Sequence, residues 1–180
     1  ATDPGFLGSL GRYNQASLVR AKGIDERLLR TLAGSRSCDV YVRAAAARNP
    51  NTPIDMLEDY PRHDWRVRDG LARNPALPKH LQVRLARDKK TTVRQTLASR
   101  SDILPEALEI LICPDEHDSV LKMIAMNRRT TVAMQNRLLE IGSEEVQRFV
   151  LQRRSVQRVD LVIDALSKIS LPSAATRDPS

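Results

Sequence analysis

Two nearly matching stretches of sequence, 26 residues apart, decide the fold of this 180-residue chain. Residues 67–75 read VRDGLARNP, and residues 93–101 read VRQTLASRS. Residues 42–50 share the Val-Arg start and the Arg-Asn-Pro ending, and residues 120–127 keep a more distant version. A unit that returns at a fixed interval of this length indicates a repeat protein, in which each repeat packs only on its neighbours.

Five valines mark the repeat and lie 25, 26, 27 and 26 residues apart: Val42, Val67, Val93, Val120 and Val146. Before each valine lies another short amphipathic segment, at residues 28–33, 53–60, 78–88, 105–113 and 132–141. Apolar residues in these segments recur at a spacing of three and four, as at Leu81 and Leu85, which is typical of helices. Each repeat is therefore predicted to contain two short helices, about eleven helices in all.

Turn-forming residues separate the predicted helices. Three prolines stand where a helix should begin, at Pro53, Pro78 and Pro105. Thr52 is a candidate N-cap. The pairs Asn49-Pro50 and Asn74-Pro75 should end the preceding helices, because Asn tolerates left-handed geometry and Pro cannot continue a helix.

The repeat resembles the leucine-rich repeat variant family of bacterial helical repeats, whose unit is similar to L-A-x-D-x-x-x-x-V-R-x-x-V-A-x-N-P-x-x-P. Residues 85–98, LARDKKTTVRQTLA, are the best match, with LARNPALP at residues 71–78 just before them. The D-x-x-x-x-V-R signature of HEAT repeats overlaps this motif, so the two families compete. The resemblance implies a right-handed α-solenoid, one layer of which is close to 3₁₀ geometry. The resemblance does not imply an iron–sulfur function, because this chain has no cysteine cluster that could hold an iron–sulfur centre.

The expected fold class is thus all-α: a right-handed superhelix of repeats of about 25–27 residues that resemble leucine-rich repeat variant (LRV) and HEAT repeats, here called LRV/HEAT-like. Residues 1–23 are expected to form an N-terminal segment or cap that is partly disordered. Residues 24–155 are expected to hold five repeats and residues 156–170 a capping helix. Residues 171–180 are expected to be disordered.

Composition excludes several classes of protein. Aromatic residues make up 3% of the chain, which disfavours a barrel or a sandwich. No apolar run is long enough to span a bilayer, and no signal peptide is recognisable. The two cysteines, Cys38 and Cys113, do not make a disulfide framework and suggest reduced thiols in the cytoplasm.

Charge is unevenly distributed along the chain. The net charge is +7; residues 1–100 hold 19 Lys and Arg against 10 Asp and Glu, a balance of +9, and residues 101–180 hold 10 against 12, a balance of −2. The loops before the anchor valines carry the basic residues Arg36, Arg62, Arg66, Lys89 and Lys90, and later the acidic residues Asp115, Glu116, Asp118, Glu144 and Glu145. The opposite loops should carry Arg128, Arg129, Arg153 and Arg154. One edge of the solenoid should therefore change from basic to acidic.

The arginines of the Val-Arg pairs, Arg43, Arg68 and Arg94, have two interpretations. They could form a ladder that binds phosphates, or they could hydrogen-bond between repeats with the nearby Asp39, Asp64, Asp88 and Asp118. The structural interpretation is favoured. Trp65 is either a packed anchor or, if it is exposed, a binding hot spot.

Motifs for catalysis are absent: there is no Walker A loop, no H-E-x-x-H and no nucleophile elbow. Residues 113–117, CPDEH, could offer a thiolate, a carboxylate and an imidazole, but a single Cys-His pair does not predict a metal site. No catalytic residue, metal, cofactor, small-molecule substrate or membrane contact is therefore expected.

The sequence favours a non-catalytic scaffold or adaptor that binds a protein partner through its concave face and charged loops. The alternative is a protein that binds the backbone of nucleic acid through the basic loops of the N-terminal repeats. Candidate partner-binding residues under either hypothesis are Arg36, Arg62, Trp65, Arg66, Lys89, Lys90, Arg128 and Arg129.

Overall fold

The computed structural model describes residues 9–21, 23–34, 38–60 and 63–167. In these ranges the chain forms helices and turns, and no strand, so the prediction of an all-α chain is confirmed for the described residues. The helices are α2 (Arg12–Val19), α3 (Glu26–Ala33), α4 (Val40–Arg48), α5 (Ile54–Asp59), α6 (Trp65–Ala72), α7 (Lys79–Ala86), α8 (Thr91–Ala98), α9 (Pro105–Leu111), α10 (Asp118–Met126), α11 (Val132–Ile141) and α12 (Glu144–Ser167).

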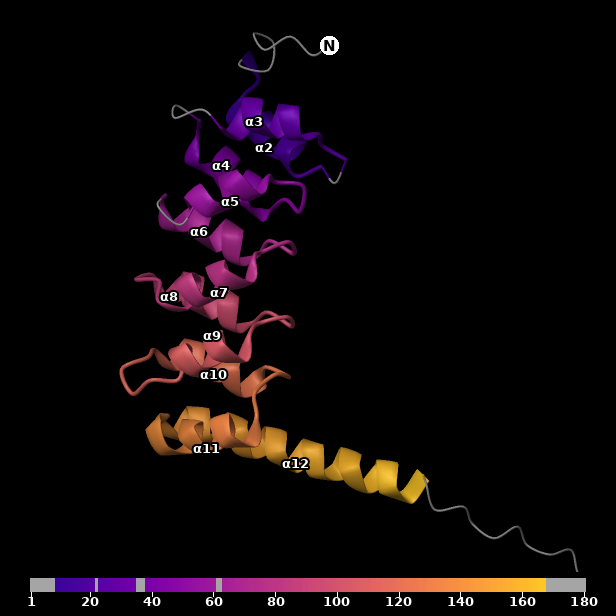
Figure 1. Ribbon diagram of the computed structural model, residues 1–180. Helices are drawn as coiled ribbons and strands as arrows, with labels where there is room; N and C mark the ends of the chain where they lie inside the picture. The colour runs from indigo at the N-terminus through magenta and orange to yellow at the C-terminus, as the bar shows by residue number, and fades with distance from the viewer. Residues whose placement is uncertain (1–8, 22, 35–37, 61–62, 168–180) are drawn as a thin grey trace, which may run out of the picture.

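Alternate helices form two layers. Helices α2, α4, α6, α8, α10 and α12 pack on one another in chain order, and we call them the even layer. Helices α3, α5, α7, α9 and α11 form the odd layer, in which α7 and α9 pack together but the other neighbours contact each other much less. Figure 1 shows the resulting stack, which runs from α2 at the top to α12 at the bottom.

The two edges of the stack carry different turns. Figure 1 shows the turns before α8 and α10 at the left-hand edge, which we call the first edge. The turns after α6, α8 and α10 lie at the right-hand edge, which we call the second edge. In this part of the chain, the loops before and after the even helices therefore lie on opposite edges, as expected.

The anchor valines form the centre of the core. Val42, Val67, Val93, Val120 and Val146 all have 0% exposure and belong to the even layer. At α4 and α6 small residues bring the backbones close together. A Cβ atom on Gly70 would lie 2.4 Å from the carbonyl oxygen of Ala44, so any side chain at position 70 would push the two helices apart.

Prolines and aspartates begin helices as residue chemistry predicts. Pro53 and Pro78 immediately precede α5 and α7, and Pro105 is the first residue of α9. The prediction for Thr52 was wrong. Its buried hydroxyl donates to the carbonyl of Ala46 at 2.6 Å, so it satisfies the C-terminal end of α4 instead of beginning α5.

The two ends of the stack can be compared with the predicted division. Helix α2 lies within the predicted N-terminal segment or cap; it packs on α4 and buries Val19, so it is the first helix of the even layer. At the other end, no break separates a fifth repeat from a cap at residue 156, because α12 is one helix from Glu144 to Ser167. The predicted disordered tail, residues 171–180, lies outside the described residues.

Candidate functional site

A ladder of buried hydrogen bonds joins successive even helices along the second edge. Asn74 Nδ2 donates to the carbonyl oxygens of Ala47 and Asn49 at 2.8 and 2.7 Å. The other rungs are Asn49 to Val19 and Ala21, Arg100 to Ala72 and Asn74, Asn127 to Ala98 and Arg100, and Arg153 to Ala125. The rungs recur at the interval of the sequence repeat, so the repeat is also the spacing of these inter-helix bonds.

The asparagines do not act through left-handed geometry, as the sequence suggested. Asn49 and Asn127 have φ of −76° and −73° and extended ψ, and no non-glycine residue in the described ranges has positive φ. Instead, each side-chain oxygen accepts the N–H two residues later, from Asn51 and Arg129, at 2.8 and 2.9 Å. One amide thus turns its own chain and caps the preceding helix of the even layer.

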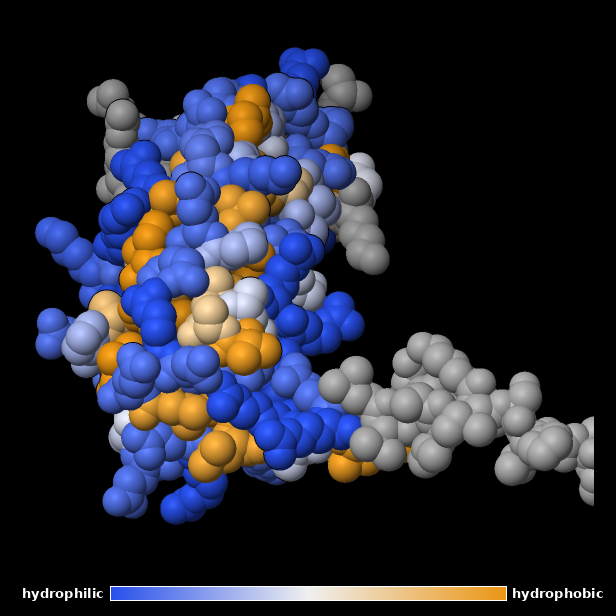
Figure 2. Space-filling model, turned by 60° about the horizontal axis from the view of Figure 1, so that its bottom comes forward, coloured by the Kyte–Doolittle hydropathy of each residue, from blue (hydrophilic) through white to orange (hydrophobic). Residues whose placement is uncertain are grey.

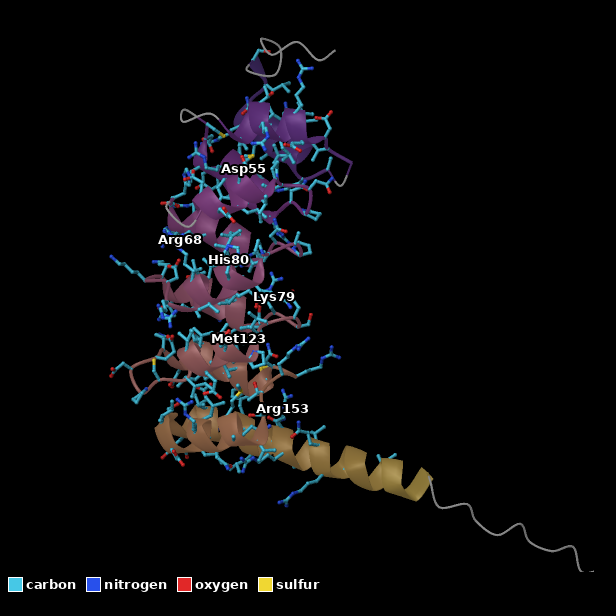
Figure 3. All side chains as sticks on the ribbon, viewed as in Figure 1. Asp55, Arg68, Lys79, His80, Met123 and Arg153 are labelled. Atoms are coloured by element: carbon cyan, nitrogen blue, oxygen red, sulfur yellow. The ribbon has the colours of Figure 1, made fainter. Side chains whose placement is uncertain are left out.

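The arginines of the Val-Arg pairs tie repeats together at the first edge. Arg68 makes a bidentate pair with Asp88 at 2.5 and 2.9 Å, and Arg94 makes the same pair with Glu116 at 2.7 and 2.6 Å. Each partner belongs to the next repeat, and its side chain is at most 5% exposed. Arg68, labelled in Figure 3, is therefore committed to the structure and is not free to bind a phosphate.

Asp39 and Asp64, which we predicted as partners of these arginines, do something else. Their carboxylates accept the N–H of Tyr41 and Arg66 and begin α4 and α6. Asp118 accepts a hydrogen bond from the hydroxyl of Ser143 at 2.5 Å. Of the four predicted aspartates, Asp88 alone pairs with a Val-Arg arginine in the described contacts.

The predicted site residues Trp65, Arg66 and Lys90 meet at the first edge. The guanidinium carbon of Arg66 lies 4.8 Å from the centre of the Trp65 ring, and the Lys90 ammonium lies 5.4 Å from it. Arg66 also lies 5.8 Å from the ring of Tyr41, which is 53% exposed. Trp65 itself is half-buried and packs against the core, as expected of a packed anchor, and its role as a binding hot spot stays a prediction.

The other predicted residues of this edge are not gathered into that cluster. Lys89 is exposed and lines a pocket with Arg84 and Arg87 of the odd layer. Arg36 and Arg62 lie outside the described residues. The acidic half is weaker than predicted, because Glu116 is buried against Arg94 and Glu145 pairs with Lys122 at 2.5 Å.

Arg128 and Arg129 are exposed on the second edge, as predicted. Arg129 Nε donates to the carbonyl of Ser101 at 3.1 Å, so it also links two repeats. Arg153 and Arg154 do not lie in a loop, because α12 continues through both of them. Arg153 forms a rung, and Arg154 contacts Gln135 and Asn136 of α11.

A row of exposed side chains on the even layer was missed by sequence reasoning. The structure places Tyr13 and Tyr41, 77% and 53% exposed, on α2 and α4, and exposed Arg48 and Arg73 at the ends of α4 and α6. Aligning the chain on the ladder acceptors, which begin at Val19, finds the row, whereas aligning it on the valines does not reach α2. On the one face of the molecule drawn in Figure 2, hydrophobic patches are interrupted by hydrophilic residues.

The candidate ligands at residues 113–117 and the Cys38 thiol can be placed in the structure. The ring of His117 accepts the N–H of Ser119 and begins α10, and Glu116 pairs with Arg94, so two of the candidate metal ligands in the 113–117 segment already have structural partners. No group of three metal-ligating side chains is found among the described residues. Burial raises the pKa of the Cys38 thiol, which lowers its reactivity as a nucleophile.

No helix in the described ranges has the length and apolar character needed to cross a membrane. Comparison of the chain with protein-family models, with curated proteins and with solved structures finds no match.

Proposed function

We propose that this chain is a right-handed α-solenoid that serves as a non-catalytic scaffold in the cytoplasm and binds a protein partner on its even layer. The proposal rests on one observation: the even helices pack on one another in unbroken succession, whereas most odd helices do not. A two-layered stack whose layers are unequally close curves toward the closer layer. The even layer is then the concave face, the surface with which solenoids bind their partners.

The family resemblance supports the same arrangement, because LRV/HEAT-like repeats form superhelices. The exposed side chains fit a protein interface too. Tyrosine, tryptophan and arginine are the residues most enriched in binding hot spots, and Tyr13, Tyr41, Trp65 and Arg66 lie on adjacent even helices.

Binding to a nucleic-acid backbone is the second candidate, favoured by the Arg66 cation beside the exposed Tyr41 ring and the Lys90 cation beside the half-buried Trp65 ring. Two observations speak against it. Arg68 and Arg94 are held by carboxylates. Arg66 also contacts Asp64 at 3.3 Å. Each of these carboxylates would repel a phosphate nearby.

The test is selection of peptides from a random displayed library on the wild-type chain and on a Tyr41→Glu/Arg48→Glu variant. We expect peptides that bind the wild type in about 0.15 M salt and lose binding to the variant, while random DNA and RNA bind weakly at that salt. The reverse result, with no enriched peptide and micromolar nucleic-acid binding that falls steeply with salt, would give the second candidate first place.

A further inference from the structure

The ladder puts the even helices in register, residue by residue. The first carbonyl acceptor of each rung belongs to Val19, Ala47, Ala72, Ala98 or Ala125. These residues occupy equivalent places in α2, α4, α6, α8 and α10. Positions counted from them can therefore be compared along the layer without relying on sequence similarity.

Two equivalent positions of the first three even helices carry a distinct chemistry. The residue after the acceptor is Arg20, Arg48 or Arg73 in α2, α4 and α6, but Ser99 and Met126 in the next two helices. Six residues before the acceptor stand Tyr13, Tyr41 and Arg66, and then Thr92 and Ser119. We call Arg20, Arg48 and Arg73 the arginine row, and Tyr13, Tyr41 and Arg66 the tyrosine row.

Both rows lie on the same side of the layer. They are seven residues apart on each helix, which is two turns or about 10 Å along the axis. Tyr13, Tyr41 and all three arginines of the arginine row are exposed. Two residues before the acceptor the helices carry Ser17 on α2, Ala45 on α4 and Gly70 on α6, where α8 and α10 have Thr96 and Met123. Gly70 is buried against Ala44 and Ala47 of α4, so α4 and α6 approach each other closely and their rows lie side by side.

The arginine row carries uncompensated charge. Arg73 pairs with Asp69 at 2.9 Å and contacts Thr96, whereas Arg20 and Arg48 have no ion pair within the described part of the chain. The helix dipole favours basic residues at helix C-termini, which would account for the arginines alone. It does not account for the exposed tyrosines that stand in register with them.

We infer that the arginine and tyrosine rows of α2, α4 and α6 bind an extended acidic, proline-containing segment of a partner protein. The inference rests on the proposed function and names its partner class. Helices packed side by side are about 8–10 Å apart. A polyproline II chain repeats every three residues, about 9 Å, and exposed aromatic rings are the usual platform for its prolines. A segment with a carboxylate at every third residue would meet the arginine row in step, with its prolines on Tyr13 and Tyr41.

A nucleic-acid strand fits these rows less well. Asp69, next to the arginine row, would repel a continuous phosphate chain, whereas a carboxylate placed at every third residue can avoid it.

The test is a binding titration, by fluorescence anisotropy, with a labelled peptide of about fifteen residues that repeats Glu-Pro-Pro. A peptide of the same composition with its glutamates clustered at one end controls for net charge, and a Lys-Pro-Pro peptide controls for charge sign. Emission from Trp65, the single tryptophan of the chain, reports on the neighbouring surface. We expect the periodic peptide to bind roughly tenfold more tightly than the clustered one.

Two matched double variants locate the site. Arg20→Gln/Arg48→Gln removes two exposed arginines of the arginine row, and Arg84→Gln/Arg87→Gln removes two exposed arginines of α7 and its C-cap in the odd layer. The first should weaken binding roughly tenfold or more, and the second should leave it within about twofold. Circular dichroism checks that both variants keep their helices, and Tyr41→Phe and Tyr41→Ala separate the ring from its hydroxyl, with binding lost only in the alanine variant.

Equal affinity for periodic and clustered peptides, equal loss in both double variants, or tighter binding of a single-stranded oligonucleotide would each overturn the inference. The proposed function can hold even where this inference fails. If the displayed library yields peptides that need Tyr41 and Arg48 but are neither acidic nor proline-containing, the scaffold function stands and the acidic polyproline partner is wrong.

Discussion

The turn after α10 and the middle of α12 occupy the same rung position of the ladder, 26 residues apart, yet the chain turns at one and runs straight through the other. At Asn127 the helix ends, the amide donates to Ala98 and Arg100, and Thr130 donates back to Ile124. At Arg153 a long side chain reaches Ala125 while its own backbone stays helical. A rung can therefore form without a turn, whereas at Asn127 one short amide makes both the rung and the turn.

Arg100 sharpens this comparison, because it is an arginine at a rung where the chain does turn. Its guanidinium donates to Ala72 and Asn74, both at 2.7 Å, and is held by Asp102 at 2.7 and 2.9 Å. Arg153 has no such carboxylate, because the residue two positions later is Ser155. The Nε atom of Arg153 is buried and has no hydrogen-bond partner among the described residues. Figure 3 labels Arg153 near the point where α12 leaves the stack.

The largest effect should come from moving a turn into α12. The double change Arg153→Asn/Arg154→Pro transplants the Asn-Pro pair found at residues 49–50 and 74–75. Proline inside a helix costs about 3 kcal/mol, so α12 should end near residue 152 and residues 155–167 should lose hydrogen-exchange protection. Arg153→Asn alone is the control and should keep the helix. Full protection of residues 155–167 in the double variant would show that the turn needs more than these two residues.

Removing a turning rung should come next. Asn127→Ala leaves the buried carbonyls of Ala98 and Arg100 without their donor and should lower the free energy of unfolding by about 3 kcal/mol. Chemical denaturation followed by circular dichroism measures it. Asn14→Ala, at an exposed site of α2, should change stability by less than about 0.5 kcal/mol. A similar loss of unfolding free energy in both variants would show that the ladder does not stabilise the fold.

The two arginine rungs should respond unequally to the same substitution. Arg100→Leu removes two short bonds to backbone carbonyls and should cost about 2 kcal/mol. Arg153→Leu removes a single bond of 3.2 Å and a buried unsatisfied N–H, so it should cost about 0.5 kcal/mol or less. Burial lowers the pKa of Arg153, which is the mark of a cation poorly compensated by its surroundings. Equal destabilisation in denaturant would remove the distinction between the two rungs.

The smallest effect should be a pH dependence confined to the Arg100 rung. Hydrogen bonds from Arg100 hold the pKa of Asp102 below its usual 3.8, so the folded state favours the charged carboxylate. That contribution is present above about pH 4 and is lost as the pH falls through the lowered pKa of the folded state. Asp102 is half-exposed, so about 0.5 kcal/mol is expected. Unfolding of Asp102→Asn, compared with wild type between about pH 6 and 3, measures it; an unchanged difference across that range would contradict the assignment.

The repeat, the helical class and the inter-repeat role of Arg68 and Arg94 could be predicted from the sequence, because apolar spacing and the Val-Arg pairs recur visibly. The rungs at Arg100 and Arg153 could not, because the bond is to a backbone carbonyl, which any donor of suitable reach can satisfy. The equivalence of the asparagine and arginine rungs therefore cannot be recognised from sequence similarity. At Asn49 the expectation of left-handed geometry also kept the hydrogen-bond ladder from being predicted.

The candidate site was predictable only in part. Trp65, Arg66 and Lys90 are near one another in sequence or on neighbouring loops, and they meet. The contact of Tyr41 with Arg66, and the alignment of Tyr13 with Tyr41, depend on which helices are adjacent in space. Periodicity shows that a helix buries one face, but it does not say which helix lies next to it.

The ladder also has a direction in time. Every rung is donated by a later residue to carbonyls that lie 25 to 30 residues earlier in the chain. As the chain leaves the ribosome N-terminus first, each acceptor helix is already made when its donor emerges. Successive even helices can then dock one at a time on a finished surface. In α12 the matching carbonyls lie inside a continuing helix. They therefore do not form an end-of-helix surface on which a further helix could dock in the same way.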